Sequence, residues 1–107
     1  MYTRLTIVHV KLDKIDEAIR IYNENVIPSA KSQPGCQGCY LLTNRKTGKG
    51  IVLTMWDTHY DASIGEQNGY YQAQLNKFAG MFVKKPVHEN YEVIFQENVS
   101  TQPVLTE

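Results

Sequence analysis

The chain has 107 residues, which suits one domain and leaves no room for two. Lysine plus arginine equals aspartate plus glutamate at 11 each, so charge gives no reason to expect nucleic acid or an anionic membrane as a partner. No stretch approaches the roughly 18 apolar residues of a membrane helix, and the N-terminal residues lack a signal-peptide pattern. We therefore expect the fold to begin almost at Met1 and the protein to be cytoplasmic.

The first third of the chain predicts a strand followed by a helix. Residues 3–12 are rich in β-branched side chains and contain no breaker, which is typical of a strand. Asp13 has the residue type of a helix N-cap, and Asp16 adds a favourable charge to the first turn. Apolar residues then recur every three or four positions up to Ala30, as on one buried helix face. Pro28 is expected to bend or shorten the last turn, because it lacks a backbone N–H.

The rest of the chain predicts a hairpin, a broken helix and a final strand. Residues 39–45 and 51–57 form the hairpin around a glycine-containing turn. Thr58 or Asp57 caps the second helix, which is interrupted at Asn68 and Gly69, two poor helix formers. After a connector, residues 91–97 are the last predicted strand. Beyond the break, apolar side chains spaced four, three and four residues apart are interpreted as core: Tyr71, Leu75, Phe78 and Phe82.

This order, β-α-β-β-α-β, predicts an α+β protein with a ferredoxin-like fold. Such a fold has a four-stranded antiparallel sheet with both helices on one face. Residues 1–97 form the single predicted domain. Residues 98–107 are a C-terminal tail of mixed composition, expected to be irregular or to contact a partner chain.

The predicted strands are apolar on both faces, which favours a homodimer. Leu5 and Ile7 alternate with Val8 and Val10 in the first strand, and the strand at 51–57 shows the same pattern. Two helices cover only one face of the sheet. The other face would expose a large apolar patch, which soluble monomers rarely do. A second copy packed sheet against sheet would bury it.

Cys36 and Cys39 are the only cysteines, in the run PGCQGC. Two thiols at this spacing suit a redox pair or half of a metal site. Zinc needs two further ligands, and no second motif supplies them. A redox pair usually opens a helix, whereas these residues lead into a predicted strand. Inert small residues are the favoured interpretation, redox or metal roles are the alternatives, and no metal site is expected.

Four segments together resemble the antibiotic biosynthesis monooxygenase family, whose members are dimeric α+β barrels with a ferredoxin-like fold. The segments are residues 8–22, 34–44, 51–58 and 89–95, and with their spacing the resemblance covers residues 3–97. The family includes cofactor-free oxygenases that act on quinol-like or polyketide aromatic substrates, and relatives that bind and degrade haem. One fold hosts many functions, so the resemblance is stronger for fold than for activity.

The resemblance implies roles for only some residues. Trp56 matches the tryptophan that ends the third strand across the family. The cofactor-free enzymes also use an asparagine and a tyrosine nearby, but Val52 and Thr54 occupy the preceding strand, so the asparagine is missing. The candidates for the tyrosine are Tyr60, Tyr70 and Tyr71.

The haem-degrading branch uses an asparagine on the first strand and a tryptophan and a histidine on the second helix. These positions fall near His9, Gly65 and Leu75. This large departure argues against haem degradation.

The candidate catalytic residues are His9, His59 and Trp56. Trp56 can stack on an aromatic substrate or donate its indole N–H, or it simply plugs the barrel end. His9, inside a strand, can act as a base toward a phenol or an enol, or is a hydrogen-bonded core histidine. His59 opens the second helix, where the dipole favours the neutral form that accepts a proton; an exposed first-turn histidine is the alternative. The candidate substrate-binding residues are Trp56, Tyr60, Tyr70, Tyr71 and Phe78.

These observations lead to two functional hypotheses. The first is a cofactor-independent monooxygenase that acts on a small electron-rich aromatic, quinol-like or polyketide-like. The second is a non-catalytic dimer that binds a small apolar or aromatic ligand or has a stress-related role. The missing asparagine favours binding, whereas Trp56 with nearby tyrosines and histidines favours chemistry.

Overall fold

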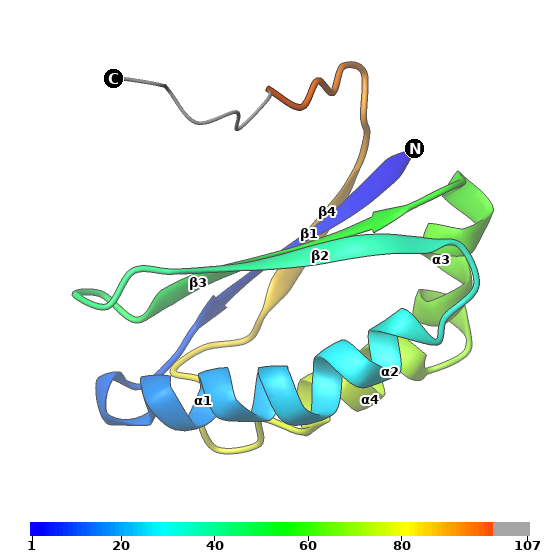
Figure 1. Cartoon of the computed structure of the whole chain (residues 1–107). Helices are drawn as coiled ribbons and strands as arrows, with labels where there is room; N and C mark the ends of the chain where they lie inside the picture. Colours follow the sequence, from blue (N-terminus) through cyan, green and yellow to red (C-terminus); the bar gives the residue numbers. More distant parts are fainter. Residues whose placement is uncertain (100–107) are drawn as a thin grey trace, which may run out of the picture.

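The computed structural model describes residues 1–99, and in them one antiparallel sheet is covered on one face by helices (Figure 1). The strand order is β2-β3-β1-β4. The predicted ferredoxin-like α+β fold is confirmed. The strands are β1 (Tyr2–His9), β2 (Cys36–Thr43), β3 (Lys49–Trp56) and β4 (Val87–Glu92).

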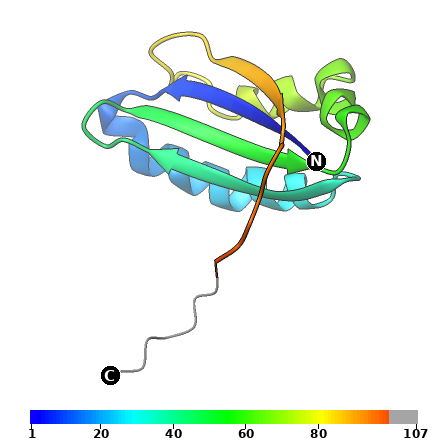
Figure 2. The same ribbon diagram turned by 90° about the horizontal axis from the view of Figure 1, so that it is seen from above.

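The helical layer consists of two groups, one after β1 and one after β3. Seen from above, both groups lie behind the sheet (Figure 2). The first group is η1 (Leu12–Lys14), α1 (Ile15–Ile21), η2 (Tyr22–Val26) and α2 (Ile27–Lys31). The second group is α3 (His59–Gln67) and α4 (Tyr70–Asn76).

The first helix starts later than the sequence predicted. β1 ends at His9, and a short 3₁₀ turn at Leu12–Lys14 precedes α1. The predicted N-cap at Asp13 is therefore wrong, because Asp13 lies inside that turn and the N-cap position of α1 is Lys14. Asp16 does lie in the first turn of α1, as expected.

Pro28 changes the helix just before it instead of ending it. A proline has no N–H to donate, so the carbonyl four residues earlier loses its usual partner. The chain widens here into the π turn η2, and the Ile27 N–H donates to the Tyr22 carbonyl, five residues back. The helix then continues through α2 with Pro28 in its first turn. Single π turns of this kind are frequent at functional sites.

The second helical group matches the sequence prediction in its cap and its break, but α4 ends at Asn76, so Phe78 and Phe82 lie beyond the helix. The Thr58 hydroxyl accepts a hydrogen bond from the Asp61 N–H at 3.0 Å, so Thr58 is the N-cap of α3. The helix breaks at Asn68 and Gly69, and Gly69 has a φ of +89°, which favours glycine. The break redirects the chain, so α4 is a separate helix.

The last strand begins four residues earlier than predicted and ends five residues earlier. It spans Val87–Glu92, whereas residues 91–97 were expected. Tyr2 pairs with Glu92, and the Val93 N–H donates to the Met1 carbonyl, so the neighbouring strand ends there. Residues 94–99 have no further β1 residue to pair with. They leave the sheet on the side opposite the helices (Figure 1).

Alternation along the strands separates a helix-facing side from an open side. Val8 and Val10 face the helices and pack with Ile15, Ala18 and Met81 in the buried core. The alternate residues of β1, and the β3 and β4 residues that pair with them, face the other way. No helix or strand of residues 1–99 covers that open face (Figure 2).

The described residues contain no helix long and apolar enough to cross a membrane. Of the predicted C-terminal tail at 98–107, only residues 98 and 99 are among the described residues, and they form no helix or strand.

Candidate functional site

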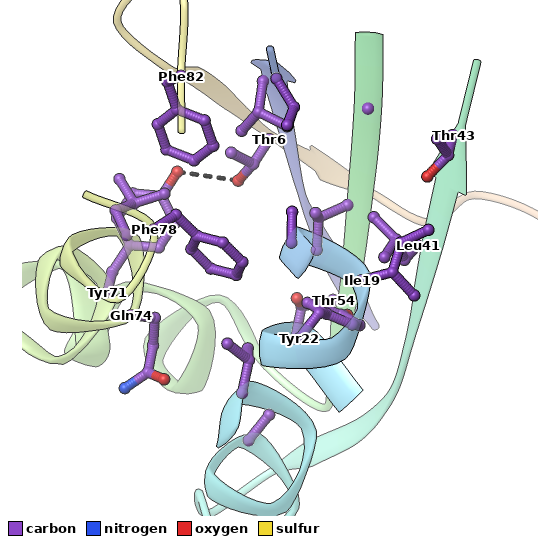
Figure 3. A pocket seen from close by; sticks show the side chains of 18 of the residues that line it. Thr6, Ile19, Tyr22, Leu41, Thr43, Thr54, Tyr71, Gln74, Phe78 and Phe82 are labelled. Carbon is purple, nitrogen blue, oxygen red and sulfur yellow. Dashed lines mark hydrogen bonds between the residues drawn. The ribbon is translucent and has the colours of Figure 1, made fainter. Parts of the chain in front are cut away.

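A cavity of about 100 Å³ lies between the sheet and the helices (Figure 3). Its floor is the helix-facing side of β1 and β3, and its walls come from α1, η2 and α4. Most of the lining is apolar, with Val8, Val52, Leu75, Phe78 and Phe82 among its side chains. A concave apolar cavity with a few polar groups is typical of a small-molecule site.

Three buried polar atoms on the cavity lining have no hydrogen-bond partner within residues 1–99. They are the indole Nε1 of Trp56, the hydroxyl of Tyr70 and the Oε1 of Gln74. Trp56 is the most buried large residue, with 2% of its surface exposed. Buried polar groups normally have hydrogen-bond partners, so three unpaired polar atoms around one cavity are unusual.

Arg4 places a buried cation beside these groups. Its Nη2 donates to the Ala62 carbonyl at 2.5 Å, and its Nε donates to the Glu66 carboxylate at 3.0 Å. The guanidinium also lies over the rings of Trp56, at 5.5 Å, and Tyr71, at 4.6 Å. The cation thus holds both aromatic side chains in place.

Glu66 anchors a polar network at the edge of the sheet. Besides Arg4, it accepts hydrogen bonds from Asn90 at 3.0 Å and contacts His88 Nε2 at 3.0 Å. Burial alone would raise the pKa of Glu66, but the hydrogen bonds from Arg4, Asn90 and His88 outweigh it and lower that pKa. Glu66 is therefore ionised at neutral pH and compensates Arg4.

Two tyrosine hydroxyls also face the cavity. The Tyr71 hydroxyl shares a 2.9 Å hydrogen bond with Thr6, which Figure 3 shows crossing from α4 to β1. Burial raises the pKa of Tyr71. Burial, together with the neighbouring Cys39 thiol, raises the pKa of Tyr22. Both phenols are therefore neutral donors at physiological pH.

The structure brings four of the predicted site residues together. Trp56, Tyr70, Tyr71 and Phe78 all line the cavity. Tyr60 does not, because it lies on α3 with 69% of its surface exposed.

The two candidate histidines lie elsewhere. His9 ends β1 on the open face, paired with Lys49, and burial with the charges of Lys84 and Lys49 lowers its pKa. His59 is an exposed first residue of α3 and touches the Tyr2 ring edge-on at 5.4 Å between centroids. Neither lines the cavity, so neither is in place to act on a ligand bound there.

An outer groove adjoins the cavity on the other side of α4. Tyr71, Leu75, Phe78 and Phe82 line both spaces and so form the wall between them. The groove also carries His88, whose ring meets Tyr71 edge-on at 4.8 Å.

Sequence reasoning missed Arg4, Tyr22 and Gln74. Arg4, Thr6 and Val8 are alternate residues of one strand, so they face the same side of the sheet. This alternation could have predicted that Arg4 faces the helices. Gln74 is one helical turn after Tyr70, so these two share a helix face. Only the tertiary fold shows that this face meets Trp56.

The cysteines lie at the start of β2 as free, half-buried thiols. Burial raises the pKa of Cys36, which makes its reactive thiolate scarcer. Among residues 1–99, no group of three or more histidine, cysteine or acidic side chains is arranged to hold a metal ion.

Comparison with solved structures identifies the fold. A candidate antibiotic biosynthesis monooxygenase of Nitrosomonas europaea superposes with a TM-score of 0.71 at 18% identity, covering 89% of this chain and all of that one. The heme-degrader MhuD of Mycobacterium tuberculosis, solved with two hemes bound, gives 0.73 at 14% identity and covers 92% and 100%. A Streptomyces coelicolor monooxygenase in complex with nanaomycin D gives 0.74 at 9% identity and covers 92% of each chain. This chain has the fold of the antibiotic biosynthesis monooxygenases.

Sequence comparison adds less. Two uncharacterized Mycobacterium tuberculosis proteins are 31% identical over 58 residues, which is 54% of this chain but 26% of theirs. The match thus spans about a quarter of these curated relatives. No family model matches the chain.

Proposed function

We propose that this protein is a cofactor-independent monooxygenase that oxidises a small electron-rich aromatic compound in the cavity between the sheet and the helices. The observation that carries the proposal is the cavity itself, which is mostly apolar and has on its floor Trp56, whose indole N–H is unsatisfied among residues 1–99. The solved structures that share the fold include monooxygenases, one of them in complex with nanaomycin D.

The side chains around the cavity suit this chemistry. Trp56, Tyr71 and Phe78 offer ring faces that fix the plane of an aromatic substrate. The Arg4 cation lies over the Trp56 and Tyr71 rings and favours the anionic form of a phenol, which is the form that oxygen attacks. The apolar walls exclude water, and this strengthens every charge interaction inside.

The proposed active form is a homodimer with the open sheet faces together. That face carries exposed Tyr40, Leu42, Val87 and Tyr91. Ile94, Phe95 and Val99, each more than three-quarters exposed, follow β4 on the same side and would pack on the second copy. A contiguous apolar surface of this kind marks an association site.

A second candidate function is ligand binding without turnover. One observation favours it: none of the cavity-lining residues in the described part of the chain is a histidine, aspartate or glutamate. A general base, which typically contributes about 10²–10⁴-fold in rate, must be within hydrogen-bond reach of the proton it removes. An enzyme built on this cavity must release the proton of a phenol through water or through a tyrosine hydroxyl.

Oxygen consumption separates the two functions. Chelator-treated protein should consume oxygen with at least one member of a panel of quinols and anthrones, and Trp56→Phe should lower the rate at least tenfold while leaving the fold intact. Tyr60→Phe is the matched control and should keep the parent rate, because Tyr60 is 69% exposed on α3 and does not line the cavity. Ligand binding without oxygen consumption above background would instead establish the binding function.

A further inference from the structure

The three unsatisfied atoms on the cavity have defined hydrogen-bonding characters. The Trp56 Nε1–H can only donate, the Gln74 Oε1 can only accept, and the Tyr70 hydroxyl can do either. Leaving such groups buried and unpaired is destabilising, so a ligand that pairs with them gains affinity by removing that cost. These atoms therefore describe the polar groups of the ligand.

The three atoms come from two sides of the cavity. Trp56 ends β3 on the cavity floor. Tyr70 and Gln74 lie four residues apart on α4, so both project from one face of the helix that forms the opposite wall. Figure 3 shows Gln74 on this wall, on the same helix as Tyr71.

The cavity volume limits the size of the ligand. It measures about 100 Å³. A cavity of about 150 Å³ is enough for benzene in another protein, so a single ring is the largest aromatic group that fits with small side-chain adjustments. Fused polycyclic compounds exceed this volume.

From these constraints we infer that the ligand is a single-ring compound with two polar groups, a hydroxyl that donates to Gln74 and a carbonyl or oxyanion that accepts from Trp56 and Tyr70. Gln74 is then the residue that selects hydroxylated rings. The inference rests on the proposed function, since it concerns the same cavity, and it adds the chemistry that decides which substrate is taken. Ordered water is the competing occupant of the three atoms, but water cannot select one ring over another.

Calorimetric titration with four related compounds tests the inference. The compounds are 4-hydroxyacetophenone, with both groups, acetophenone, with the carbonyl, 4-ethylphenol, with the hydroxyl, and ethylbenzene, with neither. The parent protein should bind the first most tightly and the last most weakly. Gln74→Met, which keeps the side-chain length, should weaken the two hydroxylated compounds about tenfold and leave acetophenone unchanged. Tyr70→Phe should weaken the two carbonyl compounds and spare 4-ethylphenol.

Gln72→Met is the matched control, because Gln72 is an exposed residue of the same helix that bonds only to Asn76 within the described residues. It should bind all four compounds like the parent. Equal weakening of all four by Gln74→Met, or no binding of any of them to the folded parent, would overturn the inference. Selective binding without oxygen consumption would uphold it and refute the enzyme. If the parent consumes oxygen and Gln74→Met binds the four compounds as the parent does, the enzyme would be upheld and the inference refuted.

Discussion

Arg4 is the residue on which the polar side of the cavity depends. It is 4% exposed, and a buried guanidinium is tolerated only when it is paired and hydrogen-bonded. Glu66 supplies the charge, Ala62 a carbonyl, and two aromatic rings cover the remaining face. Removing one partner of such a pair leaves an uncompensated buried charge, which costs more than the pair contributes.

Glu66→Gln should therefore destabilise the protein at neutral pH by about 3 kcal/mol, at the low end for a buried pair because Glu66 is partly exposed. The folded-state pKa of Glu66 is lowered. Its stabilising contribution is thus fully present above the ordinary glutamate pKa of about 4.3 and is lost as the pH falls through the lower folded value. Urea unfolding at fixed protein concentration should show the gap between parent and variant closing as the pH falls from 7 to 3.

The matched control is Glu24→Gln, which removes the partner of an exposed pair with Arg20 at 3.2 Å. Exposed helix pairs of this spacing contribute about 0.3–0.5 kcal/mol. The control should change the free energy of unfolding by no more than that at any pH. If Glu66→Gln behaved like this control, the network would be a surface feature without structural weight.

At the scale of elements, the hairpin turn holds β3 against the end of β1. Gly48 has a φ of +81°, its carbonyl accepts from the Val10 N–H at 2.9 Å, and a Cβ there would collide with the Val10 carbonyl oxygen. Gly48→Ala should therefore cost more than the roughly 1–2 kcal/mol of left-handed strain alone. Gly80→Ala has the same strain, with a φ of +82°, but no atom of the described residues lies within 4 Å of its Cβ.

Thermal or urea unfolding of both alanine variants gives the comparison. Gly80→Ala reports the strain, and the difference between the two variants reports the collision with β1. Equal destabilisation would mean that the turn relaxes freely and does not fix the position of β3.

The elements were predictable because their signals are local. Helix spacing, the Thr58 cap and the break at Asn68 and Gly69 each act within a few residues, and all three are as expected. The last strand was misplaced because its position is set by its partner. The segment after Tyr91 has the stronger strand composition, yet β1 begins at Tyr2, so pairing stops near Glu92.

The site was only half predictable for the same reason. Trp56, Tyr70 and Tyr71 were found from residue type and family resemblance, and they do line the cavity, whereas Tyr60 does not. Gln74 and Arg4 carry no such signal, since a glutamine on a helix and an arginine on a strand are usually solvated. Their burial follows from strand order, which places β1 and β3 beneath α3 and α4.

At the scale of the whole molecule, helices of the described residues cover only one face of the sheet. The open face is apolar at its centre and at its edges, with Leu42 at 48% and Val87 at 56% exposure. The Tyr2–Glu92 pairing ends β4 just before three exposed apolar residues, Ile94, Phe95 and Val99, on the same side. A single copy would present this surface to water, which favours pairing with a second copy.

Leu42→Asp should convert the protein from a dimer to a folded monomer. Leu42 already lies exposed on the isolated chain, so its replacement costs little within one copy but buries a carboxylate without a partner between two sheets. Light scattering at micromolar concentration should give twice the chain mass of 12.2 kDa for the parent and about one chain mass for the variant. Leu12→Asp is the matched control, since Leu12 is 62% exposed but lies outside the open face, and it should stay dimeric. A parent mass of one chain would reject the dimer, and a dimeric Leu42→Asp would move the interface away from the sheet.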